Sequence, residues 1–194
     1  MWRVWKLYDP LRAMVADNIA TRVRKNRGTR LLNLFAYTGS FTVHAAKAGA
    51  SRSTTVDLSN TYQAWTARNF ALNGIDGNAH TLERADVFTW LVQARKNGER
   101  YDVIVLDPPS FSNSKKMVDV LDVQRDHVKL VTQCCELLNP DGELYFSTNL
   151  RTFEIDPKLT QRFPLREITA KSVPEDFRRP NRRPPHRAWH CAMA

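Results

Sequence analysis

The sequence predicts a doubly wound α/β fold, in which helices cover both faces of a mostly parallel sheet that ends in antiparallel strands near the C-terminus. Short apolar runs alternate with longer segments of helical spacing. The runs at Leu31–Leu34 and Tyr101–Leu106 are mostly apolar, as in strands covered on both faces. Turn residues separate these segments, so strands and helices alternate as they do in parallel crossover units.

The N-terminal segment leads into a helix. Residues 1–8 alternate apolar and basic side chains, a pattern that fits an edge strand as well as a frayed start. A helix is expected over Pro10–Lys25, because proline is favoured in the first turn and apolar residues recur close to one face. Basic residues follow from Arg22 to Arg30. The helix dipole favours cations there, so this cluster has a structural explanation besides a nucleic-acid one.

A strand, a turn and a helix are expected between Leu31 and Ala50. Gly39 suits the turn because glycine adopts backbone angles that other residues resist, and Ser40 is expected to cap the helix that ends at Gly49. The helix N-terminus then lies at the carboxyl end of the strand, where open α/β sheets bind ligands. On this stretch alone, any strand–helix unit of an α/β protein is the alternative.

The remaining elements continue the alternation. In chain order they are a strand over Ser53–Leu58, a helix capped by Ser59 or Asn60 and ending at Asn73-Gly74, a strand at Thr81–Glu83, a helix from Val87 to Asn97-Gly98, a strand over Tyr101–Leu106, a helix over Val123–Leu138 and a strand over Glu143–Ser147. A polar loop is expected over Ser112–Asp122. Strands near Leu165–Thr169 and Ala188–Met193, on either side of a Pro/Arg-rich loop at Pro174–Arg187, predict the antiparallel end of the sheet.

Composition restricts the class of protein. The 194 residues form one domain without internal repeats or linkers, and the net charge of +9 favours a polyanionic partner, with a merely soluble basic surface as the alternative. Cys134, Cys135 and Cys191 lack metal or disulfide spacing and are expected to be reduced core residues of an intracellular protein. We find neither a membrane-spanning apolar run nor a signal peptide, so a cytoplasmic location is expected.

Three acidic residues, Asp57, Asp86 and Asp107, fall at the carboxyl ends of successive predicted strands. Each alone has the role of a helix N-cap as an alternative. Together they indicate a ligand with hydroxyl and amine groups, because a buried carboxylate costs several kcal/mol unless it is paired. The first turn has a single glycine and the chain lacks a Walker lysine motif, so a pyrophosphate site and a nicotinamide-dependent dehydrogenase are disfavoured.

Six motifs carry a family resemblance. They are Asn33–Ser40, Thr55–Ser59, Arg68-Asn69, Asn73-Gly74, Asp107–Lys115 and Asp122–His127. With these motifs the chain resembles the class I S-adenosylmethionine-dependent methyltransferases, and within them the C-terminal, guanine-N7-methylating half of the bifunctional bacterial large-subunit ribosomal RNA methyltransferases. The resemblance implies a Rossmann-like methyltransferase sheet, S-adenosyl-L-methionine as the cofactor and ribosomal RNA as the partner.

The resemblance also implies roles for individual residues. The implied cofactor residues are Asn33, Phe35, Tyr37, Thr38 and Gly39 around the methionine part, Asp57 at the ribose, Asp86 at the adenine amine, and Leu58 and Val87 beside them. The implied catalytic residues are Asp107, Pro108, Pro109 and Phe111, which would line the pocket for the target base, with the ring of Phe111 available for stacking.

The absence of a cysteine after one of the predicted strands indicates how the target base is methylated. Related cytosine-C5 methyltransferases carry a cysteine nucleophile just after the strand that matches Leu144–Phe146, whereas this chain has Ser147-Thr148-Asn149 there. Direct attack by a lone pair, as at guanine N7, is therefore favoured, and catalysis would consist mainly of orientation. His127 is expected to be a packed or capping helix residue rather than a general base.

RNA contacts are predicted at Lys115, Arg178, Arg179, Arg182 and Arg183, where prolines stiffen the arginine-rich loop. A solvated charge run is the alternative.

The chain departs from the family near its N-terminus, where Trp5–Asp9 replaces a segment that ends in Asp-His-Arg. The family's N-terminal methyltransferase and RNA-binding modules are missing as well. The chain is thus expected to be a fragment or a divergent form, and a non-catalytic RNA-binding module is the alternative function.

Overall fold

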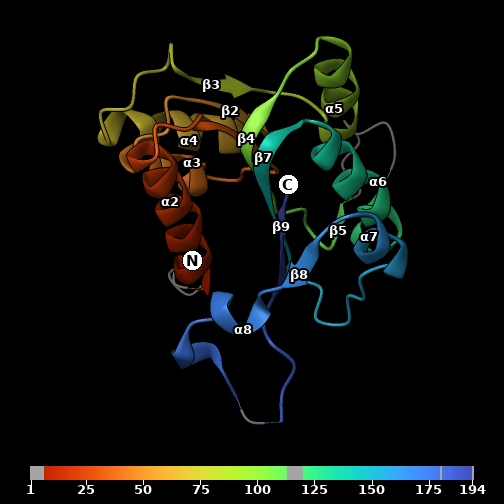
Figure 1. The fold of residues 1–194 in the computed structure, drawn as a ribbon. Coiled ribbons are helices and arrows are strands. Elements are labelled where there is room, and N and C mark those ends of the chain that lie inside the picture. Colours follow the sequence, from red (N-terminus) through yellow and green to blue (C-terminus); the bar gives the residue numbers. More distant parts are fainter. Residues whose placement is uncertain (1–6, 113–119, 180, 194) are drawn as a thin grey trace.

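The computed structural model describes residues 7–112, 120–179 and 181–193, which form a seven-stranded sheet with the strand order β3-β2-β1-β4-β7-β9-β8 (Figure 1). The strands are β1 (Arg30–Leu34), β2 (Arg52–Val56), β3 (His80–Glu83), β4 (Tyr101–Leu106), β7 (Leu138–Thr148), β8 (Leu165–Glu167) and β9 (Arg187–Ala192). The first five strands are parallel, and β9 is antiparallel to both β7 and β8. The predicted fold class is therefore confirmed.

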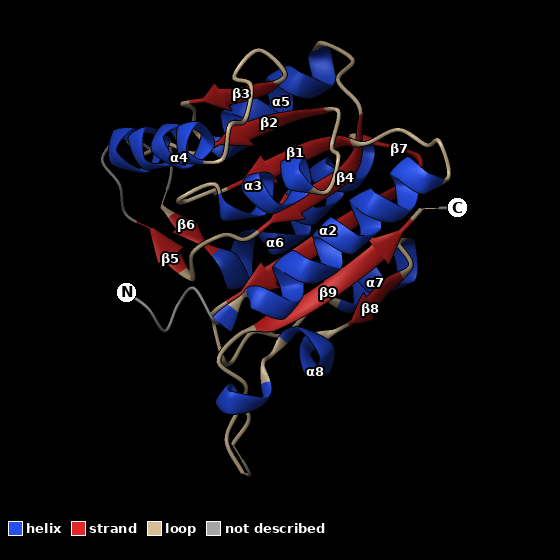
Figure 2. Ribbon diagram, turned by 90° about the vertical axis from the view of Figure 1, so that its left-hand side faces the viewer, coloured by secondary structure: helices blue, strands red, loops and turns tan. Residues whose placement is uncertain are grey.

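The helices lie on both faces of this sheet (Figure 2). They are α2 (Asp9–Arg24), α3 (Ser40–Lys47), α4 (Asn60–Leu72), α5 (Val87–Lys96), α6 (Val123–Glu136), α7 (Pro157–Arg162) and α8 (Thr169–Ser172), and the 3-10 helix η1 spans Glu175–Phe177. None of the helices in the described part of the chain is long and apolar enough to cross a membrane.

Alternation along each strand divides the core into two layers. In β1, Leu31 packs in a cluster with α2 and α3, whereas Leu32 and Leu34 pack in a second cluster with α5 and α6. Successive side chains of a strand point to opposite faces, so an apolar strand such as β4 serves both layers. This is why the central strands were recognisable in the sequence as mostly apolar runs.

Several local expectations were wrong. Gly39, not Ser40, is the residue that precedes the helix α3, and it adopts φ +69°. Tyr8 precedes α2 in a non-extended conformation, so the edge-strand alternative fails there, while residues 1–6 lie outside the described residues. Thr169 begins the helix α8 instead of ending a strand. The strand expected over Glu143–Ser147 is longer, because β7 begins at Leu138 and ends at Thr148.

The segment after β4 and the tail also hold unexpected elements. The expected loop over 112–122 is bounded by two short antiparallel strands, β5 (Phe111–Ser112) and β6 (Leu121–Asp122), and residues 113–119 lie outside the described residues. The helices α7 and α8 were not anticipated. For α4 the two alternatives are resolved, because the Ser59 hydroxyl accepts the Tyr62 N–H.

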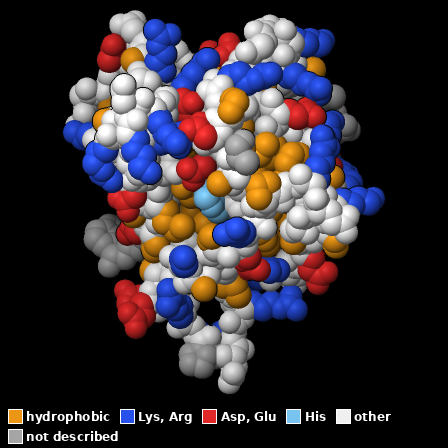
Figure 3. Space-filling model, in the orientation of Figure 1, with side chains coloured by type: hydrophobic (Ala, Val, Ile, Leu, Met, Phe, Trp, Pro, Cys, Tyr) orange, Lys and Arg blue, Asp and Glu red, His pale blue; other side chains and the backbone are white. Residues whose placement is uncertain are grey.

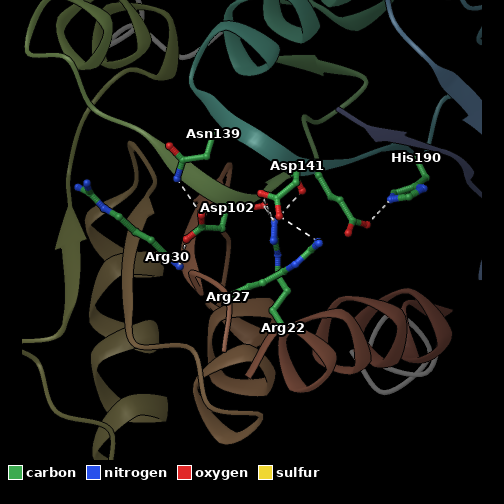
Figure 4. A network of polar contacts seen from close by, with 8 residues as sticks. Arg22, Arg27, Arg30, Asp102, Asn139, Asp141 and His190 are labelled. Carbon is green, nitrogen blue, oxygen red and sulfur yellow. Dashed lines mark hydrogen bonds and ion pairs between the residues drawn. The ribbon is translucent and has the colours of Figure 1, made fainter. Parts of the chain in front are cut away.

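A polar network closes the edge at which the parallel strands begin (Figure 4). The carboxylate of Asp102 accepts the backbone N–H of Arg30 at 2.7 Å and the side-chain N–H of Asn139 at 2.7 Å. Arg22, at the end of α2, donates to the carbonyl of Asp141 at 2.7 Å. Two residues of the basic cluster, Arg22 and Arg27, thus have a structural partner in Asp141.

Gly28→Ala is expected to lower the free energy of unfolding by about 1–3 kcal/mol. A Cβ at this position would lie 2.6 Å from Oδ2 and 2.7 Å from Oδ1 of Asp102. That carboxylate cannot withdraw without losing its bonds to Arg30 and Asn139. Urea denaturation measures the change. Gly77→Ala is the control, because nothing lies within 4 Å of its added Cβ; equal losses in the two variants would contradict the prediction.

Candidate active site

A pocket of about 960 Å³ opens at the edge where the central parallel strands end. Asp57, Asp86 and Asp107 all line it, so the structure brings the three predicted acids together. Leu58, Val87, Pro108 and Pro109 line it as well. A smaller recess of about 70 Å³ shares lining residues with this pocket. The larger volume is of the size that small-molecule sites have.

The turn from β1 to α3 forms one wall of this site. Asn33 and Thr38 line the recess, and Phe35 and Tyr37 line both cavities. Phe35 and Tyr37 have φ of 54° and 52°, which is unfavourable for side chains other than glycine. At Gly39, a Cβ would lie 2.3 Å from Cγ2 of Thr66, so glycine is required there.

Asp57 holds this turn against the end of β2. Its Oδ2 accepts the backbone N–H of Tyr37 at 2.9 Å, and its Oδ1 accepts the N–H of Ser59 at 2.8 Å. Burial raises the pKa of Asp57, and these two hydrogen bonds act in the opposite direction. Thr66 supports the same turn by donating to the carbonyl of Tyr37 at 3.2 Å.

Asp86 is both the N-cap of a helix and a lining residue of the pocket. It is the N-cap of α5, where its Oδ1 accepts the backbone N–H of Thr89 at 3.0 Å, and it also lines the pocket. The N-cap alternative is therefore correct for Asp86. Capping occupies one carboxylate oxygen and leaves the lining position intact.

Asp107 is partly buried, and two hydroxyl groups hold it. Its Oδ1 accepts the Ser147 hydroxyl at 2.6 Å and the Tyr8 hydroxyl at 3.3 Å. Burial raises the pKa of Asp107 to about 6 despite these hydrogen bonds. Tyr8 also lines both the pocket and the recess. Sequence reasoning missed Tyr8, although it noted that the segment before Pro10 departs from the family pattern.

Phe111 lies beside the pocket, in β5, with 60% of its surface exposed. Its backbone neighbour Ser110 donates its hydroxyl to Asn149, which follows β7, and its carbonyl accepts the N–H of Val123 at 3.2 Å. The segment after Pro109 is thereby fixed between β7 and α6. The ring of Phe111 is available to a ligand larger than the pocket.

The predicted RNA-binding residues divide into three groups. Arg178 folds back and donates to the carbonyls of Val173 at 3.2 Å and Ala170 at 2.6 Å, so it stabilises its own loop. The side chains of Arg179, Arg182 and Arg183 are exposed. Lys115 lies outside the described residues. Figure 3 shows Lys and Arg side chains scattered over one face, with acidic side chains among them and hydrophobic side chains gathered near its centre.

The described residues of the arginine-rich loop, 173–179 and 181–186, lie at the same edge of the sheet as the pocket. The loop leads into β9, whose first residue Arg187 pairs with Thr148 at the end of β7. Asn149, the next residue, lines the pocket. The loop and the pocket are thus joined through the ends of β7 and β9.

His127 is a packed residue, as expected. It is buried, its Nδ1 lies 2.8 Å from the carbonyl of Gln124, and its Nε2 accepts the backbone N–H of Asp156 at 3.0 Å. Asp156 is the N-cap of α7, so His127 fixes the start of that helix. The three cysteines are buried and unbridged.

The chain matches a protein-family model. The model described as S-adenosylmethionine-dependent methyltransferase covers residues 17–186. Among solved structures, a putative methyltransferase complexed with SAH superimposes with a TM-score of 0.74 and 27% identity, over 93% of this chain and 48% of the other. A putative SAM-dependent methyltransferase from Streptococcus mutans gives 0.72 and 27%, with the same coverage.

Curated relatives are more similar in sequence. The ribosomal RNA large subunit methyltransferase K of Neisseria meningitidis serogroup B is 57% identical over 162 residues, which are 84% of this chain and 45% of that protein. The ribosomal RNA large subunit methyltransferase K/L of Hahella chejuensis is 52% identical over 167 residues, 86% of this chain and 22% of that protein. The chain therefore spans less than half the length of these relatives.

Asp107→Asn is expected to stabilise the fold by about 2 kcal/mol at pH 8 and to change it little at pH 4. The pKa of Asp107 is about 6 in the folded protein against 3.8 ordinarily, so folding favours the protonated carboxyl. Wild-type stability from this group therefore falls as the pH rises from about 4 to about 6. Asparagine carries no charge and keeps an oxygen for the Ser147 hydroxyl.

Urea denaturation at both pH values measures this difference. Asp17→Asn is the control, because Asp17 is an exposed residue of α2. An effect of Asp107→Asn that is the same at pH 4 and pH 8 would show that the buried charge does not destabilise the fold.

Proposed function

This chain belongs to the S-adenosylmethionine-dependent methyltransferase family, and we propose that it transfers a methyl group to a guanine, at N7, in large-subunit ribosomal RNA. One observation carries the proposal: the strand ends gather Asp57, Asp86 and the segment Asp107–Pro109 around one pocket. The curated relatives are ribosomal RNA large subunit methyltransferases, which supports the choice of ribosomal RNA.

The cofactor of the family is S-adenosylmethionine, and the residues of this site fit it. Oδ1 of Asn33 is a buried acceptor without a hydrogen-bond partner among the described residues, whereas its Nδ2 donates to Thr42 at 3.0 Å. Asn33 lines the recess together with Thr38, next to the turn that needs Gly39. An ammonium group is the kind of donor that this acceptor lacks.

We assign the cofactor contacts accordingly. Asn33, Phe35, Tyr37, Thr38 and Gly39 would hold the methionine part, Asp57 and Leu58 the ribose, and Asp86 and Val87 the adenine. The two carboxylates suit the donors of a ribose diol and an amine. When bound, the cofactor supplies a methyl group on a positively charged sulfur.

The chain's own residues would orient the base. Asp107 offers a carboxylate acceptor at the wall of the pocket, Pro108 and Pro109 shape that wall, and the exposed ring of Phe111 offers a stacking surface. Guanine N7 has a free lone pair, so no group has to remove a proton from it. Ser147, Thr148 and Asn149 provide no thiol at the end of β7 for covalent activation. Orientation is then the main contribution of the protein to catalysis.

RNA binding is proposed for the exposed arginines of the loop 173–186. Arg179, Arg182 and Arg183 lie on the edge of the sheet that carries the pocket, and the net charge of the chain is +9. Basic side chains at the pocket edge would neutralise phosphates next to the target base. Bringing a structured RNA base into the pocket would require unstacking, at a cost of a few kcal/mol.

Asp57→Ala is expected to weaken binding of S-adenosylhomocysteine about tenfold or more, because it removes the acceptor proposed for the ribose and frees the turn at Tyr37. Isothermal calorimetry measures the affinity, with Asp17→Ala as the control and the melting temperature as a check on folding. An unchanged affinity would remove the ribose role of Asp57. If the wild-type chain does not bind the compound at all, the alternative of a non-catalytic RNA-binding module is favoured.

Replacing Arg182 and Arg183 together by alanine is expected to weaken binding to protein-free large-subunit ribosomal RNA about tenfold at 0.1 M salt. The slope of log affinity against log salt would fall by about 1.5, because about two phosphate contacts are lost. The matched control is Arg24→Ala with Lys25→Ala, which removes the same charge at the end of α2, the opposite edge of the molecule (Figure 1). Equal losses in the two double variants would mean that only the overall charge matters.

A further inference from the structure

Tyr8, at the start of α2, lines two cavities and contacts His186 near the C-terminus. It is the residue before the helix, where its carbonyl accepts the N–H of Arg12 at 2.9 Å. Its side chain lines the pocket and the recess. The family model begins at residue 17, so Tyr8 lies outside the matched segment.

The ring of Tyr8 is held between two other rings. It stacks on His186 with centroids 4.9 Å apart and planes 15° from parallel, and it meets Phe41 edge-on at 6.3 Å. His186 is fully buried, and its Nε2 lies 2.8 Å from the Ser172 hydroxyl. Because the ring is fixed by these neighbours, the position of the phenolic oxygen is fixed as well.

That oxygen donates to Asp107. The Tyr8 hydroxyl and the Ser147 hydroxyl both donate to Oδ1 of this carboxylate, at 3.3 Å and 2.6 Å. Burial, and then the charge of Asp107, keeps the pKa of Tyr8 well above its ordinary value, so the phenol stays protonated and remains a donor. In the described part of the chain, the side-chain hydrogen bonds to Asp107 all go to Oδ1.

We propose that Tyr8 is a positioning residue for the methyl-transfer reaction: together with Ser147 it holds Asp107 by Oδ1, which leaves Oδ2 to accept an N–H group of the target base. The amino and imino groups of a guanine are donors of this kind, whereas the matching edge of adenine presents an acceptor at the ring nitrogen. The reaction itself rests on the function proposed above. The positioning contact does not, so the two can be tested separately.

Tyr8→Phe is the decisive variant, because it removes the hydroxyl and keeps the ring on His186 and Phe41. The matched control is Tyr145→Phe, which removes another tyrosine hydroxyl that donates to a carboxylate, Glu143, at 3.4 Å. Neither Tyr145 nor Glu143 lines the pocket or the recess in the described part of the chain. The other ionisable groups around the two cavities stay unchanged in both variants; they are Arg12, Tyr37, Asp57, Tyr62, Asp86 and, behind Tyr8, His186.

The first measurement is the titration of the Asp107 carboxyl carbon by NMR in the full chain labelled with [13C]aspartate, with Asp107→Asn to assign the signal. We expect the midpoint to rise by about 0.5 pH units in Tyr8→Phe and by more in Ser147→Ala, whose bond is shorter, and to stay unchanged in Tyr145→Phe. The same midpoint in Tyr8→Phe and in the wild type would overturn the proposal, whether or not the chain is active.

The second measurement is methyl transfer to protein-free large-subunit ribosomal RNA across pH. We expect kcat to fall about threefold to tenfold in Tyr8→Phe near pH 6.5, with the acid limb of the profile shifted to higher pH, while the affinity for S-adenosylhomocysteine stays within about twofold. Transfer by Tyr8→Phe with the kcat and pH profile of Tyr145→Phe would refute the positioning role. No transfer by the wild type, with the NMR shift present, would instead refute the proposed function and leave the contact established.

Discussion

In-register parallel pairing at the centre of the sheet is the constraint on which the site depends. Leu34, the last residue of β1, lies opposite Val56 of β2 on one side and Leu106 of β4 on the other. All three strands therefore end at the same level. The residues that follow these strands, Asp57 and Asp107 among them, thus lie at one edge of the sheet. A slip of one residue in either pairing would turn apolar side chains to the wrong layer, so core packing protects this register.

The two ends of β4 show how differently a buried carboxylate can be used. Asp102, at the beginning, accepts a backbone N–H and an amide N–H at 2.7 Å each and fastens the strand to its neighbours. Asp107, at the other end, has two hydroxyl donors among the described residues, and burial raises its pKa to about 6 despite them. A carboxylate whose loss of hydration is not compensated does not stabilise the fold. This imbalance is the reason for which we propose a functional role for Asp107.

The elements that the sequence predicted are those with a pattern of their own. Apolar strands such as Tyr101–Leu106 and acids at strand ends could be recognised because each is local. The helix α7 could not, because it has six residues and its start depends on a hydrogen bond from Asp156 to His127, far back in the chain. The positive φ of Tyr37 could not be predicted either, because it is stabilised by hydrogen bonds of its backbone to Asp57 and Thr66, which lie 20 and 29 residues away in the sequence.

Tyr8 shows the same limit at the site itself. Its importance follows from contacts with Asp107 and His186, which are separated from it by most of the chain, and no local pattern marks it. The stack of Tyr8 on His186 brings the start of α2 against the last residue of the arginine-rich loop. If bound phosphate moved that loop, His186 would move first. The stacked ring of Tyr8, whose hydroxyl donates to Asp107, would follow. On this geometry, Tyr8 contacts both the loop proposed to bind RNA and the carboxylate proposed to bind the base.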